Sequence, residues 1–158
     1  DQISDLFSQP FMVSVALLFT GSMLLSTKYF KKSNKQIDVK KALLIGFAQA
    51  LALVPGISRS GSTISMALGL GIKQEQAARF SFIMVLPLII AATVLEFLDL
   101  MKVGISAGEV SILLIGLTIS FIVGIFSLKL LLQLLKRGKF HYFAWYCFTV
   151  AILGLFFF

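Results

Sequence analysis

Apolar residues form long runs along this chain, and the polar residues between them gather in a few short clusters. Four runs have about the 17–25 residues that a helix needs to cross a bilayer. They predict transmembrane helices over residues 11–27, 77–98, 110–135 and 140–158. Two further runs, at 42–54 and 62–70, are too short to cross, and a polar turn separates them. The pattern therefore predicts an all-α integral membrane protein.

Composition agrees with this class. The chain is 58% hydrophobic and 13% charged, with a mean hydropathy of +0.98, whereas a soluble domain of this length has more polar surface to cover. Its net charge of +7 comes from basic residues at the ends of apolar runs, so we expect no nucleic-acid partner. The single cysteine, Cys147, excludes an internal disulfide. Because the chain begins at Asp1 and not at methionine, we expect it to be part of a longer protein.

The basic residues predict an orientation in the membrane. Loops rich in lysine and arginine face the cytoplasm. Residues 28–41 hold six lysines beside one acid, and a second basic cluster precedes the last run; these residues are Lys28, Lys31, Lys32, Lys35, Lys40 and Lys41 with Asp38, then Lys136, Arg137 and Lys139. Both loops are predicted to be cytoplasmic, and residues 99–109 are predicted to form an outer loop.

This orientation constrains the two short apolar runs. An even number of crossings must separate the two cytoplasmic loops, and the runs at 77–98 and 110–135 already supply two. Residues 42–71 must then enter and leave on the same side, as a re-entrant helical hairpin that turns at 55–60. Such interrupted helices are tolerated where they are buried in protein or line a cavity, and they build substrate sites in transporters. The alternative is one kinked transmembrane helix through 42–70. It would make the number of crossings between the two basic loops odd and so place them on opposite sides of the membrane.

The turn of this hairpin carries the chemistry. Pro55 and Gly56 are expected to end the first half-helix, and Ser60 is the expected N-cap of the second. Arg59 lies between them, although an arginine inside a membrane costs about 2.5–3.5 kcal/mol on insertion scales. A guanidinium beside a helix N-terminus suits a bound phosphate. The alternative is a capped turn whose Arg59 pairs with a carboxylate elsewhere.

The candidate site consists of the polar residues of the turn and one amide nearby. Arg59 and Ser60 are the candidate catalytic residues. Gln49 lies on the first half-helix, and its side chain is expected either to face the site or to form a hydrogen bond with another helix. The candidate substrate-binding residues are Gln49, Ser58, Arg59, Ser60, Gly61, Ser62 and Thr63.

Three segments together resemble a known family. They are residues 49–64, with the sequence QALALVPGISRSGSTI, residues 77–82 (AARFSF) and residues 132–137 (LQLLKR). They are similar to the undecaprenyl pyrophosphate phosphatases, which are linked to bacitracin resistance. The resemblance implies a multi-pass enzyme of the bacterial plasma (inner) membrane, with an inverted-repeat fold and a homodimeric state. It implies hydrolysis of undecaprenyl pyrophosphate to the monophosphate and inorganic phosphate, which sustains peptidoglycan synthesis.

The resemblance also implies roles for single residues. Arg59 would bind the pyrophosphate and stabilise charge during transfer, with Ser58, Ser60 and Thr63 as further ligands of its oxygens. The family's Glu-x-x-x-Glu helix and its Ser-Ser/Thr-Gly-His turn are absent from this chain. Those groups are the natural ligands of a divalent cation (Mg²⁺ or Ca²⁺), so no metal ligand is expected here.

We therefore expect this chain to be one half of an inverted repeat, the carboxy-terminal half, and to be inactive alone. The missing amino-terminal half would supply the metal ligands. An alternative function from another class is a lipid-phosphate transporter or flippase, because phosphate capture without hydrolysis uses the same groups. A third is a membrane assembly factor with a structural hairpin.

Overall fold

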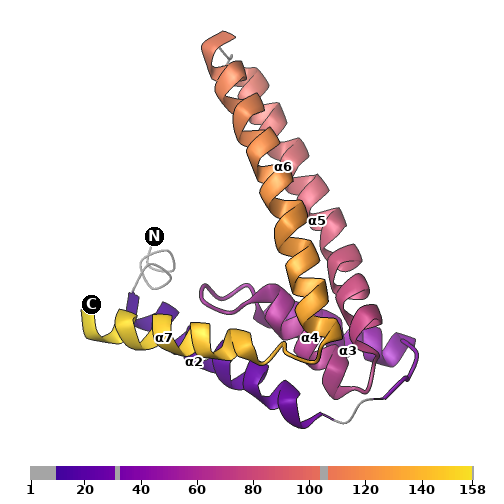
Figure 1. The fold of residues 1–158 in the computed structure, drawn as a ribbon. Helices are drawn as coiled ribbons and strands as arrows, with labels where there is room; N and C mark the ends of the chain where they lie inside the picture. Colours follow the sequence, from indigo (N-terminus) through magenta and orange to yellow (C-terminus); the bar gives the residue numbers. More distant parts are fainter. Residues whose placement is uncertain (1–9, 31–32, 104–106, 158) are drawn as a thin grey trace.

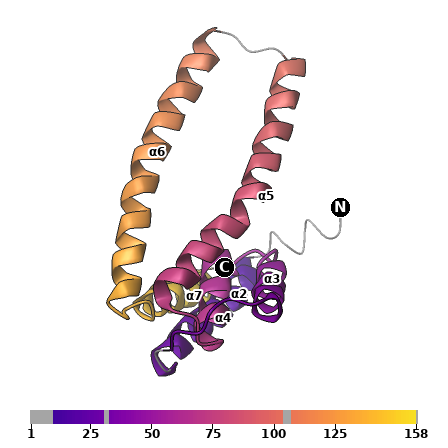
Figure 2. The same cartoon turned by 90° about the vertical axis from the view of Figure 1, so that its right-hand side faces the viewer.

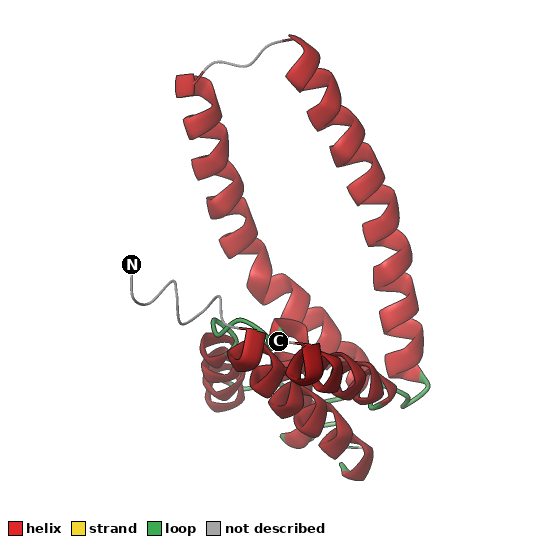
Figure 3. Cartoon of the chain, turned by 90° about the vertical axis from the view of Figure 1, so that its left-hand side faces the viewer, coloured by secondary structure: helices red, strands yellow, loops and turns green. Residues whose placement is uncertain are grey.

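A computed structural model describes residues 10–30, 33–103 and 107–157. Within these residues every regular element is a helix, and helices make up most of the described chain (Figure 3). The all-α class is confirmed. In chain order the elements are α2 (Pro10–Ser26), the short 3-10 helix η1 (Thr27–Tyr29), α3 (Val39–Leu51), α4 (Arg59–Gly69), α5 (Gln74–Val103), α6 (Ala107–Lys136) and α7 (Tyr142–Phe157).

The helices form a packed base and a long projecting pair. At the base, α2 and α7 lie side by side, and the hairpin of α3 and α4 packs next to them (Figure 1). From this base α5 and α6 project together, and they stand apart along much of their length (Figure 2). The buried core lies in the base, where α4 contacts α2, α3 and α5; its largest fully buried side chains include Ile45, Ile64, Leu135, Thr20 and Thr63.

In the described part of the chain, three helices are long and apolar enough to cross a membrane: Phe11–Tyr29, Gln74–Lys102 and Gly108–Lys136. The apolar α7 is shorter. The most apolar windows of α5 and α6 are only 6% and 0% buried, so nearly all of their apolar side chains face outward. Helices that are hydrophobic all round belong in a lipid or protein environment. The chain is therefore a multi-pass integral membrane protein.

The two long helices extend beyond their predicted spans. Residues 99–103 and 107–109 are helical, so most of the predicted outer loop belongs to α5 and α6, and residues 104–106 lie outside the described part. The charges that suggested a loop suit helix ends instead, with Glu109 in a first turn and Lys102 in a last turn. Figure 1 shows α2 and α7 running across the lower ends of α5 and α6 and not along them. That all four helices cross one bilayer therefore stays a prediction.

The hairpin itself consists of two separate short helices. Helices of 13 and 11 residues are about 20 and 17 Å long at 1.5 Å per residue, well short of a 30 Å hydrocarbon core. Since α3 and α4 pack against each other, a single kinked helix through 42–70 is excluded. Asp38 caps α3 by accepting the N–H of Lys41 at 2.9 Å. The side-chain hydrogen bond from Lys41 also lowers the pKa of the Asp38 carboxyl.

The first half-helix ends earlier than predicted. Helix α3 stops at Leu51, four residues before Pro55, and its end is closed by the N–H of Ala52, which donates to the carbonyl of Gln49 at 3.1 Å. The prediction that Pro55 and Gly56 end the helix is therefore wrong in position. Proline disfavours the helical conformation in the residue before it, so Val54 leaves the helix and the chain turns over 52–54.

Gly56 allows the turn to touch α2. Its φ of 92° is in the region that favours glycine, and a Cβ there would lie 2.6 Å from the backbone oxygen of Val13. We expect Gly56→Ala to lower the free energy of unfolding by about 1–3 kcal/mol, because neither the backbone of the turn nor that of α2 can give way. Thermal unfolding in detergent measures this.

The matched control is Gly46→Ala in the middle of α3, where a Cβ would meet nothing within 4 Å. That change is expected to stabilise the helix by about 0.5–1 kcal/mol. Equal melting temperatures for the two variants would contradict the close contact between the turn and α2.

Candidate functional site at the turn between α3 and α4

Helix α4 begins earlier than the sequence suggested. Its N-cap is Ser58, whose hydroxyl accepts the N–H of Gly61 at 3.1 Å, while its carbonyl accepts the N–H of Ser62 at 2.8 Å. The prediction of Ser60 as the N-cap is therefore wrong. Both serines suit a cap, but Ser58 is the one with extended backbone before the helix (φ −70°, ψ 116°). As a result Arg59 is the first residue of α4 and Ser60 the second.

A threonine of α2 fixes this turn. The hydroxyl of Thr20 donates to the carbonyl of Gly56 at 3.1 Å and accepts the N–H of Ser58 at 3.2 Å. Thr20 is fully buried. Sequence reasoning missed it, because Thr20 is one of five hydroxyl residues in the apolar run 11–27 and nothing marks it as the one that bonds to a distant turn. It is a positioning residue, since it holds the residue that caps α4.

Several predicted ligands are engaged in building the hairpin. The Ser62 hydroxyl donates to the carbonyl of Ser58 at 2.9 Å, and the Thr63 hydroxyl donates to the carbonyl of Arg59 at 2.9 Å. Thr63 also shares a 2.6 Å hydrogen bond with Ser81 of α5. Both Ser62 and Thr63 are buried. In this arrangement their hydroxyls hold α4 together and join it to α5, so their contact with a phosphate stays a prediction.

Arg59 and Ser60 are placed differently. Both line a cavity of about 370 Å³ whose other walls come from α5 and the turn: Ala52, Ile57, Ser81, Phe82 and Val85. This lining contains no carboxylate, and within the described residues the Arg59 guanidinium has no ion pair. The alternative of a capped turn with a paired arginine is therefore not what the described residues show.

The backbone adds donors at the same place. Within the described part of the chain, the N–H groups of Arg59 and Ser60 have no hydrogen-bond partner, as expected for the first turn of a helix. They carry the positive end of the α4 dipole. The two residues that line this cavity from α4 thus carry a guanidinium, a hydroxyl and two unbonded backbone N–H groups. This combination binds anions, and it suits phosphate oxygens in particular.

Gln49 is not brought to this cavity. Its side chain is not part of the lining, yet its amide oxygen is buried and has no hydrogen-bond partner in the described residues. A carboxylate oxygen of Glu75 on α5 lies 3.8 Å from the ammonium of Lys136 on α6. That pair is exposed and contributes little to stability.

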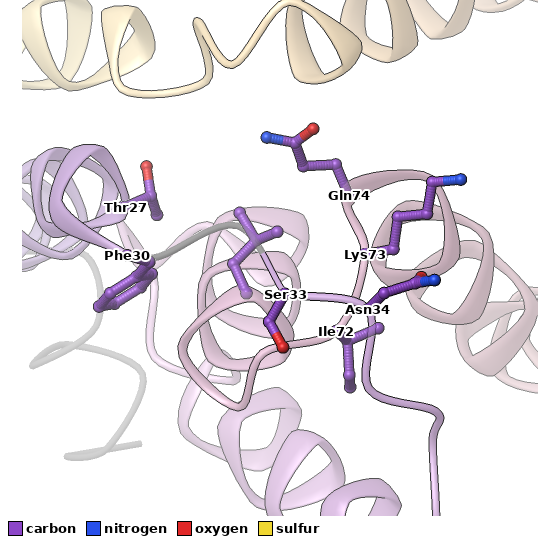
Figure 4. Close-up of a pocket in the computed structure, with 8 residues that line it drawn as sticks. Thr27, Phe30, Ser33, Asn34, Ile72, Lys73 and Gln74 are labelled. Carbon is purple, nitrogen blue, oxygen red and sulfur yellow. The ribbon is translucent and has the colours of Figure 1, made fainter.

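A further cavity of about 370 Å³ lies at the opposite end of α4 (Figure 4). Residues of the loop after η1 and of the chain around the start of α5 line it, among them Asn34, Lys73 and Gln74. It shares no lining residue with the Arg59 cavity. The described residues also bring no three His, Cys, Asp or Glu side chains together in a way that could hold a metal ion.

The fold and the turn define a class: a multi-pass, all-α membrane protein with a helical hairpin whose turn carries an arginine without an ion pair in the described residues. Comparison with known proteins is more specific. The family described as Bacitracin resistance protein BacA matches residues 1–153, and the chain belongs to this family. An undecaprenyl-diphosphatase of Salinibacter ruber is 41% identical over 98% of this chain and 57% of its own length. Those of Korarchaeum cryptofilum and Geobacter metallireducens are 39% and 44% identical, over 95% and 86% of this chain and 56% and 50% of their own lengths.

The chain thus spans a little over half the length of the curated relatives it matches. The resemblance carried by residues 49–64, 77–82 and 132–137 extends to nearly the whole chain. What the relatives' names state belongs to those longer proteins.

The role of Thr20 is testable by removing its hydroxyl. Thr20→Val keeps the shape of the side chain but leaves the Ser58 N–H and the Gly56 carbonyl without their partner, which costs about 1–3 kcal/mol for buried groups. We expect a lower melting temperature in detergent. Thr118→Val on α6 is the matched control, since Thr118 is exposed and donates to the carbonyl of Leu114 in its own helix. It should change stability by no more than about 0.5 kcal/mol. A Thr20 variant as stable as this control would refute the positioning role.

Proposed function

We propose that this chain forms part of an enzyme that hydrolyses undecaprenyl (polyprenyl) diphosphate to the monophosphate and inorganic phosphate. One observation carries the proposal: a guanidinium without a carboxylate partner in the described residues lines a cavity at the first turn of a buried helix. The names of the relatives, each an undecaprenyl-diphosphatase, support the same reaction. In cells this activity would recycle the lipid carrier of cell-wall synthesis.

The residues of this chain would bind and stabilise the diphosphate. Arg59 holds two phosphate oxygens with its planar fork. The N–H groups of Arg59 and Ser60 and the Ser60 hydroxyl donate to further oxygens. Charge that develops on the departing phosphate is stabilised by these fixed donors, which need no rearrangement during the reaction. Ser58, Gly61, Ser62 and Thr63 hold the helix start that carries the donors.

The remaining groups would come from elsewhere in the protein. Phosphoryl transfer needs charge neutralisation by a metal ion and an oriented nucleophile besides a clamp. The described residues do not fit a metal site, so we place the ligands of a divalent cation (Mg²⁺ or Ca²⁺) in the region that the relatives have and this chain does not cover. The contribution of this chain is then to bind the diphosphate and to stabilise its charge.

The proposal includes the setting of the enzyme. We infer that the chain lies in the bacterial inner membrane, that α3 and α4 form a re-entrant hairpin, and that the complete protein is a homodimer of inverted repeats. A lipid-phosphate transporter would use the same anion site. Release of inorganic phosphate from the substrate separates the two functions.

The role of Arg59 predicts the effect of its removal. In the full-length gene product, Arg59→Ala is expected to lower kcat by about 10²–10³-fold or more, as for other fixed donors to a developing charge. Arg59→Lys should keep part of the activity, since it retains the charge but loses the fork. The assay is phosphate release from undecaprenyl diphosphate in detergent. Arg137→Ala, an exposed arginine just after α6, is the control and should be unchanged. Full turnover by the alanine variant at position 59 would remove this residue from the mechanism.

Because the metal ligands and the nucleophile are proposed to lie outside this chain, we expect the chain to be inactive alone. The purified 158-residue chain is expected to release no phosphate from undecaprenyl diphosphate with Mg²⁺ or Ca²⁺ present. The intact relative from Salinibacter ruber serves as the positive control in the same assay. Hydrolysis by the 158-residue chain would show that it holds the whole catalytic machinery.

A further inference from the structure

A second and larger cavity lies beside the same turn. It has a volume of about 640 Å³ and is bounded by α2, α6, α7 and the turn, whereas the Arg59 cavity faces α5. Its lining holds no charged residue, and its walls are mainly leucines and aromatic rings. The side chains that shape it include Leu17, Leu24, Leu130, Leu131, Phe143 and Tyr146. This composition favours an apolar occupant.

The hydroxyls at the inner end of this cavity strengthen that conclusion. Thr20 is bonded to both Gly56 and Ser58, and the Ser58 hydroxyl already accepts the N–H of Gly61. Thr20 uses both its donor and an acceptor on the turn, whereas Ser58 uses only an acceptor of its hydroxyl. The lining holds no positively charged residue, and its other hydroxyl groups belong to Ser60, Ser127 and Tyr146, so the diphosphate belongs on the other side of the turn, where Arg59 lies.

The two cavities share a wall at the start of α4. Ile57 and Ser60 line both the charged cavity and the apolar one. A ligand that reaches both must be an amphiphile with an anionic head and an apolar part directly attached to it. A polyprenyl diphosphate has this chemistry, whereas a soluble diphosphate does not.

We propose that the cavity between α2, α6 and α7 holds the isoprene units next to the diphosphate, and that it selects a lipid diphosphate over a soluble one. The inference rests on the proposed function, because it takes Arg59 as the site of the head. A volume of about 640 Å³ lies within the range of about 300–1,000 Å³ found for sites of small ligands. It holds only the part of the tail nearest the head, and the rest stays in the bilayer.

Ser127 offers a way to fill the cavity without disturbing the turn. It lines the cavity from α6, yet the residue is exposed, so a larger side chain does not have to displace the core. The experiment measures equilibrium binding of a detergent-solubilised polyprenyl diphosphate and of inorganic pyrophosphate to the full-length gene product, in EDTA so that the metal-dependent hydrolysis proposed above does not consume the lipid. We expect Ser127→Trp to weaken binding of the lipid diphosphate about tenfold or more and to leave pyrophosphate binding unchanged.

Two matched variants control for the change itself. Ser127→Ala removes the hydroxyl without filling space, and it should leave both affinities unchanged. Ser120→Trp places the same ring two turns away on α6, at an exposed residue outside this lining, and should also change neither. If the alanine variant weakens lipid binding as much as tryptophan does, the hydroxyl matters and the space does not, which would overturn the proposal.

Cys147 reports directly on occupancy. It lines the same cavity and is the only cysteine of the chain. Its alkylation by N-ethylmaleimide at mildly alkaline pH, followed on the Cys147 peptide by mass spectrometry, should slow several-fold with the lipid diphosphate and not with pyrophosphate. A thiol that stays unreactive in the free protein would contradict an open cavity at this place, and an unchanged rate with the lipid would contradict its occupancy.

Arg59→Ala separates failure of this inference from failure of the proposed function. If Arg59 holds the head, this variant weakens binding of both ligands. If the tail site is wrong, Arg59→Ala still weakens both, while Ser127→Trp weakens neither or both equally. If the head site is wrong, Arg59→Ala changes neither affinity, while Ser127→Trp still weakens the lipid alone.

Discussion

The turn between α3 and α4 depends on a hydroxyl group of another helix. Thr20 bonds the carbonyl before Ile57 and the N–H after it, so the turn keeps one conformation although it is irregular backbone in an apolar protein. Where water is scarce, an unbonded peptide group is costly, and this pair of hydrogen bonds removes that cost. The same contact fixes Ser58, which caps α4. The position of Arg59 as the first residue of the helix therefore follows from a bond made by α2.

This start creates an electrostatic conflict that an anion resolves. The guanidinium of Arg59 lies at the positive end of the α4 dipole, where a negative group is favoured and a positive one is not. Within the described residues no carboxylate balances it. The hydroxyls of Ser62 and Thr63 donate back into the hairpin, so they stabilise the conformation without neutralising the charge. The unbalanced positive charge is that of the Arg59 guanidinium, with the unbonded N–H groups of Arg59 and Ser60 beside it, and this is the physical basis for our proposal that these two residues bind the diphosphate.

The sequence was sufficient to predict the class of fold. It was not sufficient to predict at which residue α4 begins or which side chain holds the turn. The apolar runs predicted an all-α membrane protein, and the length of two of them predicted paired short helices. Ser58 and Ser60 are equally good caps by residue type, so the choice between them needed the third dimension. Thr20 could have bonded a carbonyl in its own helix, as Thr118 does, and nothing local distinguishes the two. Charges at 99–109 suggested a loop, yet in a long helix they complement its ends.

The separation of charge from apolar surface at the turn follows from how α4 is held. Its start is held from one side by Thr20 of α2 and from the other by the Thr63–Ser81 contact with α5. Because the bonded hydroxyls line the α2 side, that cavity is left with an apolar character, while Arg59 lines only the cavity toward α5. A lipid whose charged head and apolar tail join at a single bond needs this arrangement, since neither part then enters the environment suited to the other. Ser60, which lines both cavities, marks where that junction would lie.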